Sequence, residues 1–374
     1  MIPLTPVVRT MPRYVTVFVN WSCNLTCREC WMYGDSAAES GWLADVRRDQ
    51  MSLEMWTALV DELAADTGTP ETTYLTMMGG EPLMHDHAVE LMRIAKERLP
   101  SCNLDMSTNG TLLDRHAAGI VASGIDDVYL SVDGPSPEVN DPIRGRNAFG
   151  RAMRGLAALQ EETRRAGRGP KVAINFVVTG MNYTHLPEMV RLTERLGLSE
   201  ITVGLSSFFT RTEGEGSRAA FEAVTGRPFL SWAGYCNEHQ HADLDPQRLR
   251  DLLDEAMNTS DSVSVLVPPV RYSNEDKSRF FTPRWHQTVR ERTCVKLWAQ
   301  TTVLPNGQVV SCTTFADTVM GSLRDGSLRE VFHGETYTRM RETLRQGLQP
   351  ICYRCCELNM DIDVDPTLYD AVAR

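Results

Sequence analysis

Three cysteines fall within eight positions near the start of the chain, in the stretch NWSCNLTCRECWMYG at residues 20–34. Cys23, Cys27 and Cys30 have the spacing C-x3-C-x2-C, and no fourth cysteine follows nearby. Cysteine thiolates bind iron–sulfur clusters, usually with one thiolate for each iron. Three thiolates on a cluster of four irons leave one iron open, as catalytic metal sites do. The triad therefore predicts a reactive metal centre, and a zinc site completed by a distant ligand is the alternative.

A second group of cysteines lies toward the C-terminus. The stretch AQTTVLPNGQVVSCT predicts a β-hairpin, because Asn-Gly is a strong turn signal. A helical pattern follows over residues 327–344, and the stretch ICYRCCEL comes next. Thiolates carried by a hairpin and a short knuckle are typical of metal sites, either iron–sulfur or structural zinc. The cysteines of this group are Cys294, Cys312, Cys352, Cys355 and Cys356.

Strand and helix patterns alternate up to about residue 205. Apolar, β-branched runs predict strands over 14–19, 72–78, 103–107, 127–132, 171–178 and 200–205. Helical patterns lie between them, over 53–65, 87–99, 114–122, 149–164 and 185–196. This alternation indicates βαβ units and a parallel sheet. Six units are too few for a closed eight-stranded barrel, so we predict an α/β fold with an open, partial (β/α)6 barrel.

Polar and glycine-rich motifs follow four of the predicted strands. The cysteine triad follows the first strand, GGEP (79–82) the second, STNG (107–110) the third and SVDG (131–134) the fourth. In parallel α/β folds, ligands bind at the C-terminal ends of the strands. The four motifs are therefore predicted to meet at one rim and to form the functional site.

Composition excludes several classes of function. The chain has 38 Lys and Arg against 49 Asp and Glu, a net charge of −11, which argues against nucleic-acid and membrane-surface partners. The 374 residues contain no long apolar run and no signal-peptide pattern at the N-terminus. We therefore expect a cytoplasmic protein. Ten cysteines in such a chain are metal ligands more often than disulfide partners.

The motifs of the first 205 residues resemble the radical S-adenosylmethionine (SAM) superfamily. The resemblance implies that the cysteine triad holds a [4Fe-4S] cluster whose open iron binds SAM. Reductive cleavage of SAM then gives a 5′-deoxyadenosyl radical that abstracts a hydrogen atom from the substrate. It also implies an external electron donor of the flavodoxin or ferredoxin type.

The same resemblance assigns SAM contacts to residues at the rim. GGEP receives the SAM amino group, Ser107 and Asn109 hold the ribose or methionine part, and Ser131 and Arg144 hold the carboxylate. The backbone near Leu205 flanks the adenine. Glu29 departs from the family, which usually has an aromatic residue before the last cysteine of the triad; Trp31 follows that cysteine here. The cofactor-binding residues so predicted are Gly79, Gly80, Glu81, Pro82, Ser107, Asn109, Ser131, Arg144 and Leu205.

The C-terminal cysteines resemble the twitch or SPASM domains that follow many radical SAM barrels. The shorter twitch pattern implies one auxiliary [4Fe-4S] cluster on Cys294, Cys312, Cys352 and Cys355, although Cys356 can replace a neighbour. No cysteine follows Cys356, so we expect one auxiliary cluster rather than two. The predicted domains are a barrel core (1–205), an insertion and connecting segment with a helix near 245–258 (206–290), and the auxiliary domain (291–374).

An auxiliary cluster near the substrate is a natural electron acceptor, which favours substrate oxidation. Sulfatase-maturing relatives carry an aspartate directly after the cysteine matching Cys312, whereas Thr313 stands here. We predict dehydrogenation of a small sugar, aminocyclitol or nucleoside, because only 13 residues precede the first strand and leave no room for a leader-binding domain.

Three alternatives stay open at this point. One is a peptide maturase, which makes a cross-link or an oxidation. Another is an epimerase, with Cys236 or Cys356 as the hydrogen-atom donor. A non-catalytic electron carrier is the third, although it has no need of GGEP, Ser131 or Arg144. Two histidines near Cys236, His239 and His241, are expected to face solvent, in a loop-rich insertion over 206–243.

Overall fold

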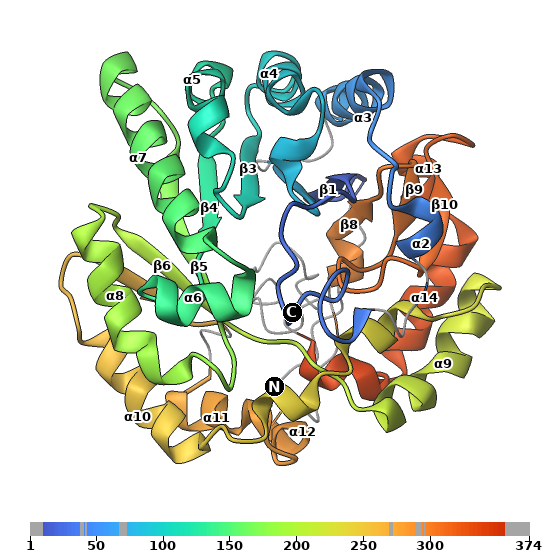
Figure 1. Cartoon of the computed structure of the whole chain (residues 1–374). Helices are drawn as coiled ribbons and strands as arrows, with labels where there is room; N and C mark the ends of the chain where they lie inside the picture. The colour runs from blue at the N-terminus through green and yellow to red at the C-terminus, as the bar shows by residue number, and fades with distance from the viewer. Residues whose placement is uncertain are drawn as a thin grey trace, which may run out of the picture.

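The computed structural model describes residues 10–37, 41, 43–66, 73–268, 272–288, 294 and 296–355. The strands form a curved inner sheet, and the helices surround it (Figure 1). The alternation predicted from the sequence is confirmed. The repeating elements are β1 (Tyr14–Asn20), α3 (Leu53–Ala65), β2 (Tyr74–Gly79), α4 (Ala88–Arg98), β3 (Asn103–Thr108), α5 (Leu113–Ser123), β4 (Asp127–Ser131), α7 (Ala148–Ala166), β5 (Lys171–Val178), α8 (Leu186–Arg195) and β6 (Glu200–Leu205).

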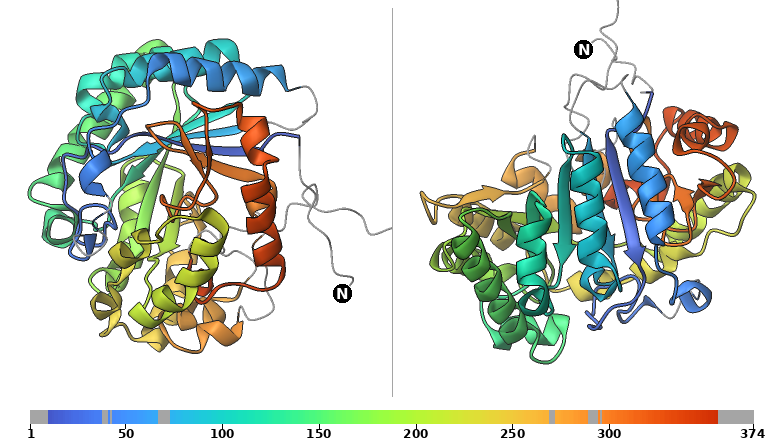
Figure 2. Two further views of the ribbon diagram at one scale, coloured as in Figure 1. Left: turned by 90° about the vertical axis from the view of Figure 1, so that its right-hand side faces the viewer. Right: turned by 90° about the horizontal axis from the view of Figure 1, so that it is seen from above.

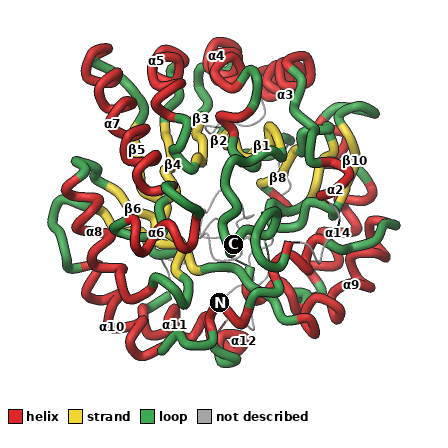
Figure 3. The backbone as a smooth tube through the Cα atoms, viewed as in Figure 1, coloured by secondary structure: helices red, strands yellow, loops and turns green. Residues whose placement is uncertain are grey.

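The strands form one ten-stranded sheet in the order β10-β9-β8-β1-β2-β3-β4-β5-β6-β7. Strands β1 to β6 are parallel and pair in sequence order. Short helices α2 (Leu43–Val46) and α6 (Pro137–Arg144) follow the ends of β1 and β4. The tube view separates the inner strands from the outer helices clearly (Figure 3). This arrangement is the predicted partial barrel.

The two faces of the sheet differ in chemistry. Apolar side chains such as Val17, Met77 and Leu130 are fully buried and pack in the main core with the outer helices. Helix α3 shows how a helix meets this layer: the Ser52 hydroxyl caps its first turn by accepting from the amide of Met55. The opposite, concave face carries half-buried polar side chains, which belong to Thr76, Ser107, Tyr129, Ser131, Asn175 and Thr202.

The C-terminal hairpin extends the sheet of the barrel. It consists of β8 (Gln300–Val303) and β9 (Gln308–Val310), and β10 (Val319–Ser322) adds antiparallel to β9. Strand β8 pairs parallel with β1, with Gln300 opposite Tyr14 and Thr302 opposite Thr16. Gly307 has φ +85, so the predicted Asn-Gly turn is confirmed. The two side views show this region continuing the sheet beside β1 (Figure 2).

Two sequence-based predictions of local structure are wrong. The helical pattern over 327–344 is two helices, α13 (Leu328–Phe332) and α14 (Glu335–Arg345), because Gly334 is extended and caps the second one. The region over 206–243 is not mainly loop: it contains α9 (Arg211–Thr225), whose capping box joins Thr210 and Glu213. The glycines at 214 and 216 hid this helix in the sequence.

The connection between β6 and β8 also contains regular structure. The predicted helix near 245–258 is α10 (Pro246–Met257). Strand β7 (Ser264–Leu266) pairs parallel with β6, and α11 (Asn274–Ser278) and α12 (Trp285–Thr288) follow it. The single sheet therefore runs through all three predicted domains, whose boundaries stay a prediction. Among the described residues, no helix is both long and apolar enough to cross a membrane.

Candidate active site

The cysteine triad lies in the loop after β1, at the C-terminal end of the sheet. Two short backbone hydrogen bonds fold this loop: the amide of Cys30 donates to the carbonyl of Cys27 (3.0 Å), and the amide of Gly34 donates to the carbonyl of Cys30 (2.6 Å). A Cβ on Gly34 would lie 2.3 Å from the carbonyl oxygen of Arg28, so the turn requires glycine here. The turn fixes Cys27 and Cys30 relative to each other.

Burial raises the pKa of all three thiols. The pKa of Cys23 rises to about 11 and that of Cys30 to about 12, and the pKa of Cys27 is raised as well. A nucleophilic cysteine needs the opposite shift, toward the thiolate at neutral pH. A buried thiolate is stable when a bound cation compensates its charge. The triad therefore fits metal ligands rather than nucleophiles.

The arrangement of the side chains also bears on the kind of metal centre. Among the described residues, no three His, Cys, Asp or Glu side chains converge closely enough to hold one metal ion. Structural zinc needs its sulfurs about 2.3 Å from one point. Cysteines of a four-iron cluster bind different irons and stay further apart.

The GGEP motif lies against the segment that leads into Cys23. The amide of Gly80 donates to the carbonyl of Asn20 (3.1 Å), and the amide of Glu81 donates to the carbonyl of Ser22 (2.8 Å). A Cβ on Gly80 would lie 2.3 Å from the Ser22 oxygen, and one on Gly79 would lie 2.5 Å from the Asn20 oxygen. Both glycines are therefore required by the close approach of two strand ends.

Glu81 joins the end of β2 to the end of β3. Its side chain is fully buried, and burial raises the pKa of its carboxyl group. One oxygen accepts from the Thr108 hydroxyl (2.7 Å) and from the amide of Leu83 (3.1 Å), and the other accepts from the amide of Asn109 (2.8 Å). Pro82 then starts a short 3-10 helix, Pro82–Met84. Both oxygens of Glu81 thus hold the rim together.

Asn109 connects this network to the triad. Its side-chain nitrogen donates to the side-chain oxygen of Asn24 (2.9 Å) and lies 3.9 Å from the sulfur of Cys23. Ser107, two residues earlier, is half-buried on the concave face. Ser107 and Asn109 therefore lie at the predicted rim, and their contact with SAM stays a prediction. The sequence analysis did not single out Asn24 or Thr108. Both lie inside motifs that other residues defined, and nothing in the sequence marked these two residues by themselves.

A buried ion pair lies on the other side of the triad. The guanidinium of Arg144, at the end of α6, is 2.5 Å from the Asp133 carboxylate. Burial acts to lower the pKa of Arg144, but the charges of Asp133, Cys27 and Cys23 together outweigh burial, so the pKa is raised and the guanidinium stays charged. The Arg144 carbonyl lies 3.7 Å from the sulfur of Cys27, and the Nε atom of Arg144 is buried without a hydrogen-bond partner. Arg144 can therefore bind an anionic group beside the triad by donating hydrogen bonds to it. Ser131, half-buried at the end of β4, is on the same rim.

Glu29 faces the end of β6. Its carboxylate accepts from the Ser206 hydroxyl (2.8 Å) and lies 3.8 Å from Nε2 of His241. Burial raises the pKa of Glu29 to about 7 and lowers that of His241 to about 4. The expectation that His241 faces solvent is wrong, because the ring packs against Phe208, whereas His239 is exposed as expected. The Leu205 side chain points into the core, so its predicted role is left to the backbone.

The four predicted auxiliary ligands line one cavity of about 40 Å³. Cys355 is buried, and the other three cysteines are half-buried. Burial raises the pKa of Cys352, and the neighbouring thiols of Cys355 and Cys294 raise it further. The structure therefore gathers the four predicted ligands around one cavity, and that they share a cluster stays a prediction. The cavity is lined by Phe221, Cys294, Lys296, Leu297, Gln300, Ser311, Cys312, Thr313, Phe315, Met340, Leu344, Cys352 and Cys355.

The structure describes one of the two predicted hydrogen-atom donors. Cys236 is half-buried, and its backbone carbonyl accepts from the hydroxyl of Ser36, beside the triad loop (2.9 Å). Cys356 lies outside the described residues. The structure therefore brings Cys236 near the triad loop, while its role as a donor stays a prediction.

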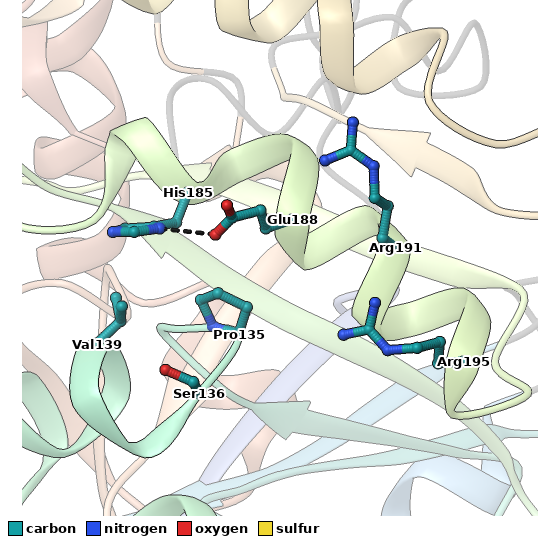
Figure 4. Close-up of a pocket in the computed structure, with 7 residues that line it drawn as sticks. All are labelled: Pro135, Ser136, Val139, His185, Glu188, Arg191 and Arg195. Carbon is teal, nitrogen blue, oxygen red and sulfur yellow. Dashed lines mark hydrogen bonds and ion pairs between the residues drawn. The ribbon is translucent and has the colours of Figure 1, made fainter.

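A separate groove lies on the outer surface between α6 and α8. It measures about 350 Å³, and one wall carries the pair formed by His185 and Glu188, whose atoms are 2.8 Å apart (Figure 4). The described residues that line this groove include none of the cysteines or rim residues of the site built above. Its lining residues are Pro135, Ser136, Val139, His185, Glu188, Arg191 and Arg195.

Family models match both halves of this site. The radical SAM superfamily model matches residues 22–193, and the SPASM model, an iron–sulfur cluster-binding domain, matches residues 294–356. The first range contains the triad, GGEP and Arg144, and the second contains the auxiliary cysteines. The cofactors that these domains imply are SAM and [4Fe-4S] clusters.

Several characterised proteins resemble parts of the chain. Over 181 residues it is 32% identical to the AdoMet-dependent heme synthase of Nitratidesulfovibrio vulgaris, which covers 48% of this chain and 44% of that protein. Over 189 residues it is 31% identical to the mycofactocin maturase MftC of Mycolicibacterium smegmatis, which covers 50% of this chain and 43% of that protein. The chain thus spans about half the length of the curated relatives it matches.

A solved structure shares the fold over most of the chain. Streptococcus suis SuiB, bound to its precursor peptide SuiA, superposes with a TM-score of 0.62 at 16% identity, covering 89% of this chain and 67% of that one. The fold, the rim motifs and the two family models agree. This chain therefore contains a radical SAM domain over residues 22–193 and a SPASM-type iron–sulfur domain over residues 294–356.

Proposed function

We propose that this chain is an oxidising radical SAM enzyme that acts on a small polar substrate. SAM at the triad cluster supplies the 5′-deoxyadenosyl radical that takes a hydrogen atom from the substrate. Arg144, with Ser131, orients the SAM carboxylate. GGEP and Asn109 shape the opposite side of the same rim. Charge-assisted pairing with a guanidinium is strong and directional, which suits Arg144 to this role.

The gathering of four cysteines around one cavity carries the oxidation proposal. A cluster there supplies an electron acceptor for the substrate radical. Gln300 and Thr313 line that cavity, and they hydrogen-bond to each other at 3.1 Å. Thr302, which lies two residues from Gln300 on β8, shares a hydrogen bond with Thr313 (3.0 Å). The auxiliary site therefore adjoins β8, the strand that pairs with β1 of the barrel.

Oxidation of an alcohol also releases a proton. Thr313, at the position of the aspartate of sulfatase-maturing relatives, is a poor base, because a neutral hydroxyl group does not take up a proton near neutral pH. Its hydroxyl hydrogen-bonds with Gln300 and Thr302. Asp105 is a buried carboxyl on the concave face and accepts from the Thr76 hydroxyl (2.9 Å). Burial raises the pKa of Asp105 to about 7. Asp105 pairs in register with Asp127, the first residue of β4, so it lies toward the N-terminal ends of the strands, away from the rim that carries the triad. A general base must lie within hydrogen-bond reach of the proton that it removes, so Asp105 is not assigned to this step.

The concave face favours a small substrate such as a sugar, aminocyclitol or nucleoside. Barrel interiors without a ligand are packed with bulky branched side chains. Here the equivalent positions carry hydroxyl and amide groups that keep partial exposure, including Thr76, Ser107, Asn175 and Thr202. These groups match the hydroxyl groups of such a substrate. Within this proposal, the enzyme works in the cytoplasm with a flavodoxin or ferredoxin type of electron donor.

A peptide substrate is the second candidate. It is favoured by the similarity to mycofactocin maturase MftC and by the fold shared with SuiB, which was solved with its precursor peptide. A short precursor-peptide gene beside the coding sequence supports this candidate, whereas sugar-modifying genes support the first. An epimerase needs a hydrogen-atom donor, so Cys236→Ala and Cys356→Ala test it: unchanged product in both variants excludes it.

Iron counting tests the core of the proposal. After anaerobic reconstitution, we expect about eight irons per chain, as for two cubane clusters. The Cys23/Cys27/Cys30→Ala variant should fall to about four and keep one EPR signal. Cys102→Ala is the matched control, because that cysteine is buried in the core. About four irons in the wild type and none in the triple variant would remove the electron acceptor and refute oxidation.

A further inference from the structure

One segment is packed between the two cysteine sites. We call residues Leu230–Cys236 the bridge segment; it contains the 3-10 helix Ser231–Tyr235. The residues Ser231 to Tyr235 are all buried. A surface loop over the barrel mouth would be exposed and mobile. The bridge segment is therefore packed as part of the protein interior.

Its first set of contacts is with the triad loop. The ring of Tyr235 stacks on that of Trp31, the residue after Cys30, with centroids 5.7 Å apart and planes at 10°. A Cβ on Gly234 would lie 2.4 Å from the carbonyl oxygen of Trp31, so the two backbones touch. The Ser36 hydroxyl adds a hydrogen bond to the carbonyl of Cys236 (2.9 Å).

Its second set of contacts is with the auxiliary site. The Tyr235 hydroxyl donates to the backbone carbonyl of Thr314 (2.9 Å), and the Thr314 hydroxyl lies 3.5 Å from the sulfur of Cys355. The Asp317 carboxylate accepts from the amides of Leu230 (2.5 Å) and Ser231 (2.7 Å). Tyr235 thus connects the neighbour of one predicted cluster ligand to the neighbour of another.

Close packing makes this connection stiff. Tyr235 is 9% exposed and also contacts the rings of Phe209 and Phe315. Protein cores pack at the density of organic crystals, so a shift on one side of such a cluster moves the other side. Coupling between two sites requires a physical element that responds to both. The bridge segment meets this requirement.

We propose that Tyr235 is a positioning residue that couples the two sites, so that a filled auxiliary site holds Trp31 and the Cys30 turn in the arrangement that binds SAM. The proposal involves no transfer of an electron, a proton or a chemical group between the two sites. It rests on the presence of the auxiliary cluster, but not on the substrate or on oxidation. Binding couplings of this kind are typically about 5- to 150-fold.

A double-mutant cycle on SAM affinity tests the proposal. Equilibrium dialysis of labelled SAM against anaerobically reconstituted protein gives Kd for the wild type, Tyr235→Phe, Cys352→Ala and the double variant. Tyr235→Phe removes the hydrogen bond to Thr314 and keeps the ring on Trp31. We expect each single variant to weaken SAM binding about tenfold, and the double variant to be no weaker than either.

Trp56→Phe is the matched control, because it removes another buried side-chain hydrogen bond of 2.9 Å, from Trp56 to the carbonyl of Leu91, outside both sites. It should leave Kd unchanged although it destabilises the chain. Effects that multiply in the double variant, an unchanged Kd in Tyr235→Phe, or an equal loss in Trp56→Phe would each overturn the coupling. If iron does not fall by about four even when Cys352, Cys355 and Cys356 are all replaced by Ala, the auxiliary-cluster assignment itself fails.

Discussion

Two buried carboxyl groups near the sheet do different work because their partners differ. Glu81 receives three hydrogen bonds from Leu83, Thr108 and Asn109, and it joins two strand ends. Burial raises the pKa of Asp105 to about 7, and the like charge of the nearby Asp127 adds to this rise. The hydrogen bond that Asp105 accepts from the Thr76 hydroxyl acts in the opposite direction but is outweighed. Asp105 is therefore protonated in the folded protein over part of the pH range in which it is ionised in the unfolded chain.

This difference predicts a pH dependence of stability. The pKa of Asp105 is raised from 3.8 to about 7, so its contribution is present below pH 3.8 and is lost as the pH rises to about 7. In Asp105→Asn this contribution is absent, and we expect the fall in Tm between pH 5 and pH 8 to be smaller than in the wild type, by the equivalent of about 2–3 kcal/mol. Equal slopes in both proteins, measured by thermal unfolding, would contradict the raised pKa.

At the scale of elements, the active site depends on how closely two strand ends approach. Strands β1 and β2 meet where Gly79 and Gly80 pass the backbone of Asn20 and Ser22. The Gly80 and Glu81 amides are both used in this junction. The loop that follows carries Cys23, so the junction decides where the first cluster ligand lies.

Adding one methyl group at this junction should therefore affect the metal site. In Gly80→Ala the new Cβ meets the Ser22 oxygen at 2.3 Å, and we expect a loss of about 3 kcal/mol in stability together with reduced iron at the triad. Gly216→Ala is the matched control, because the nearest atom to its Cβ, in Pro350, is 3.8 Å away. Thermal unfolding and iron analysis measure both effects; full iron loading of Gly80→Ala would refute the requirement for glycine.

At the scale of the whole molecule, the auxiliary region and the barrel share one sheet. Strand β8 completes the edge of β1 by parallel pairing, and unpaired strand edges are unstable and prone to aggregation. The Glu62 carboxylate on α3 also accepts from the amides of Leu328 and Arg329 at the start of α13 (2.9 Å each). The two regions should therefore unfold together.

Hydrogen–deuterium exchange can test this continuity. Loss of the auxiliary cluster in Cys352→Ala should speed exchange in β8 and in β1, its neighbour in the sheet. Strands β4 and β5 lie further along the sheet and should keep wild-type protection. Exchange that increases in β8 and leaves β1 unchanged would indicate two independent units.

Most of the regular structure follows from local sequence patterns. Six strands and five helices of the barrel agree with their predicted ranges, because each buries an apolar stripe at its own period. Helix α9 was missed because Gly214 and Gly216 lower its intrinsic helix propensity, and its tertiary packing outweighs that cost. Strand β7 was missed because three residues are too few to give a periodic signal.

The sequence by itself determined the chemistry, since cysteine spacing and the four rim motifs are local features of the chain. It could not determine that both oxygens of Glu81 accept hydrogen bonds at the rim, or that His241 is buried beside Glu29. Nor could it determine that Tyr235 contacts both Trp31 and Thr314. Those contacts join residues far apart in the chain. Their distances depend on how the sheet curves and on where β8 adds to β1, so only the tertiary structure decided them.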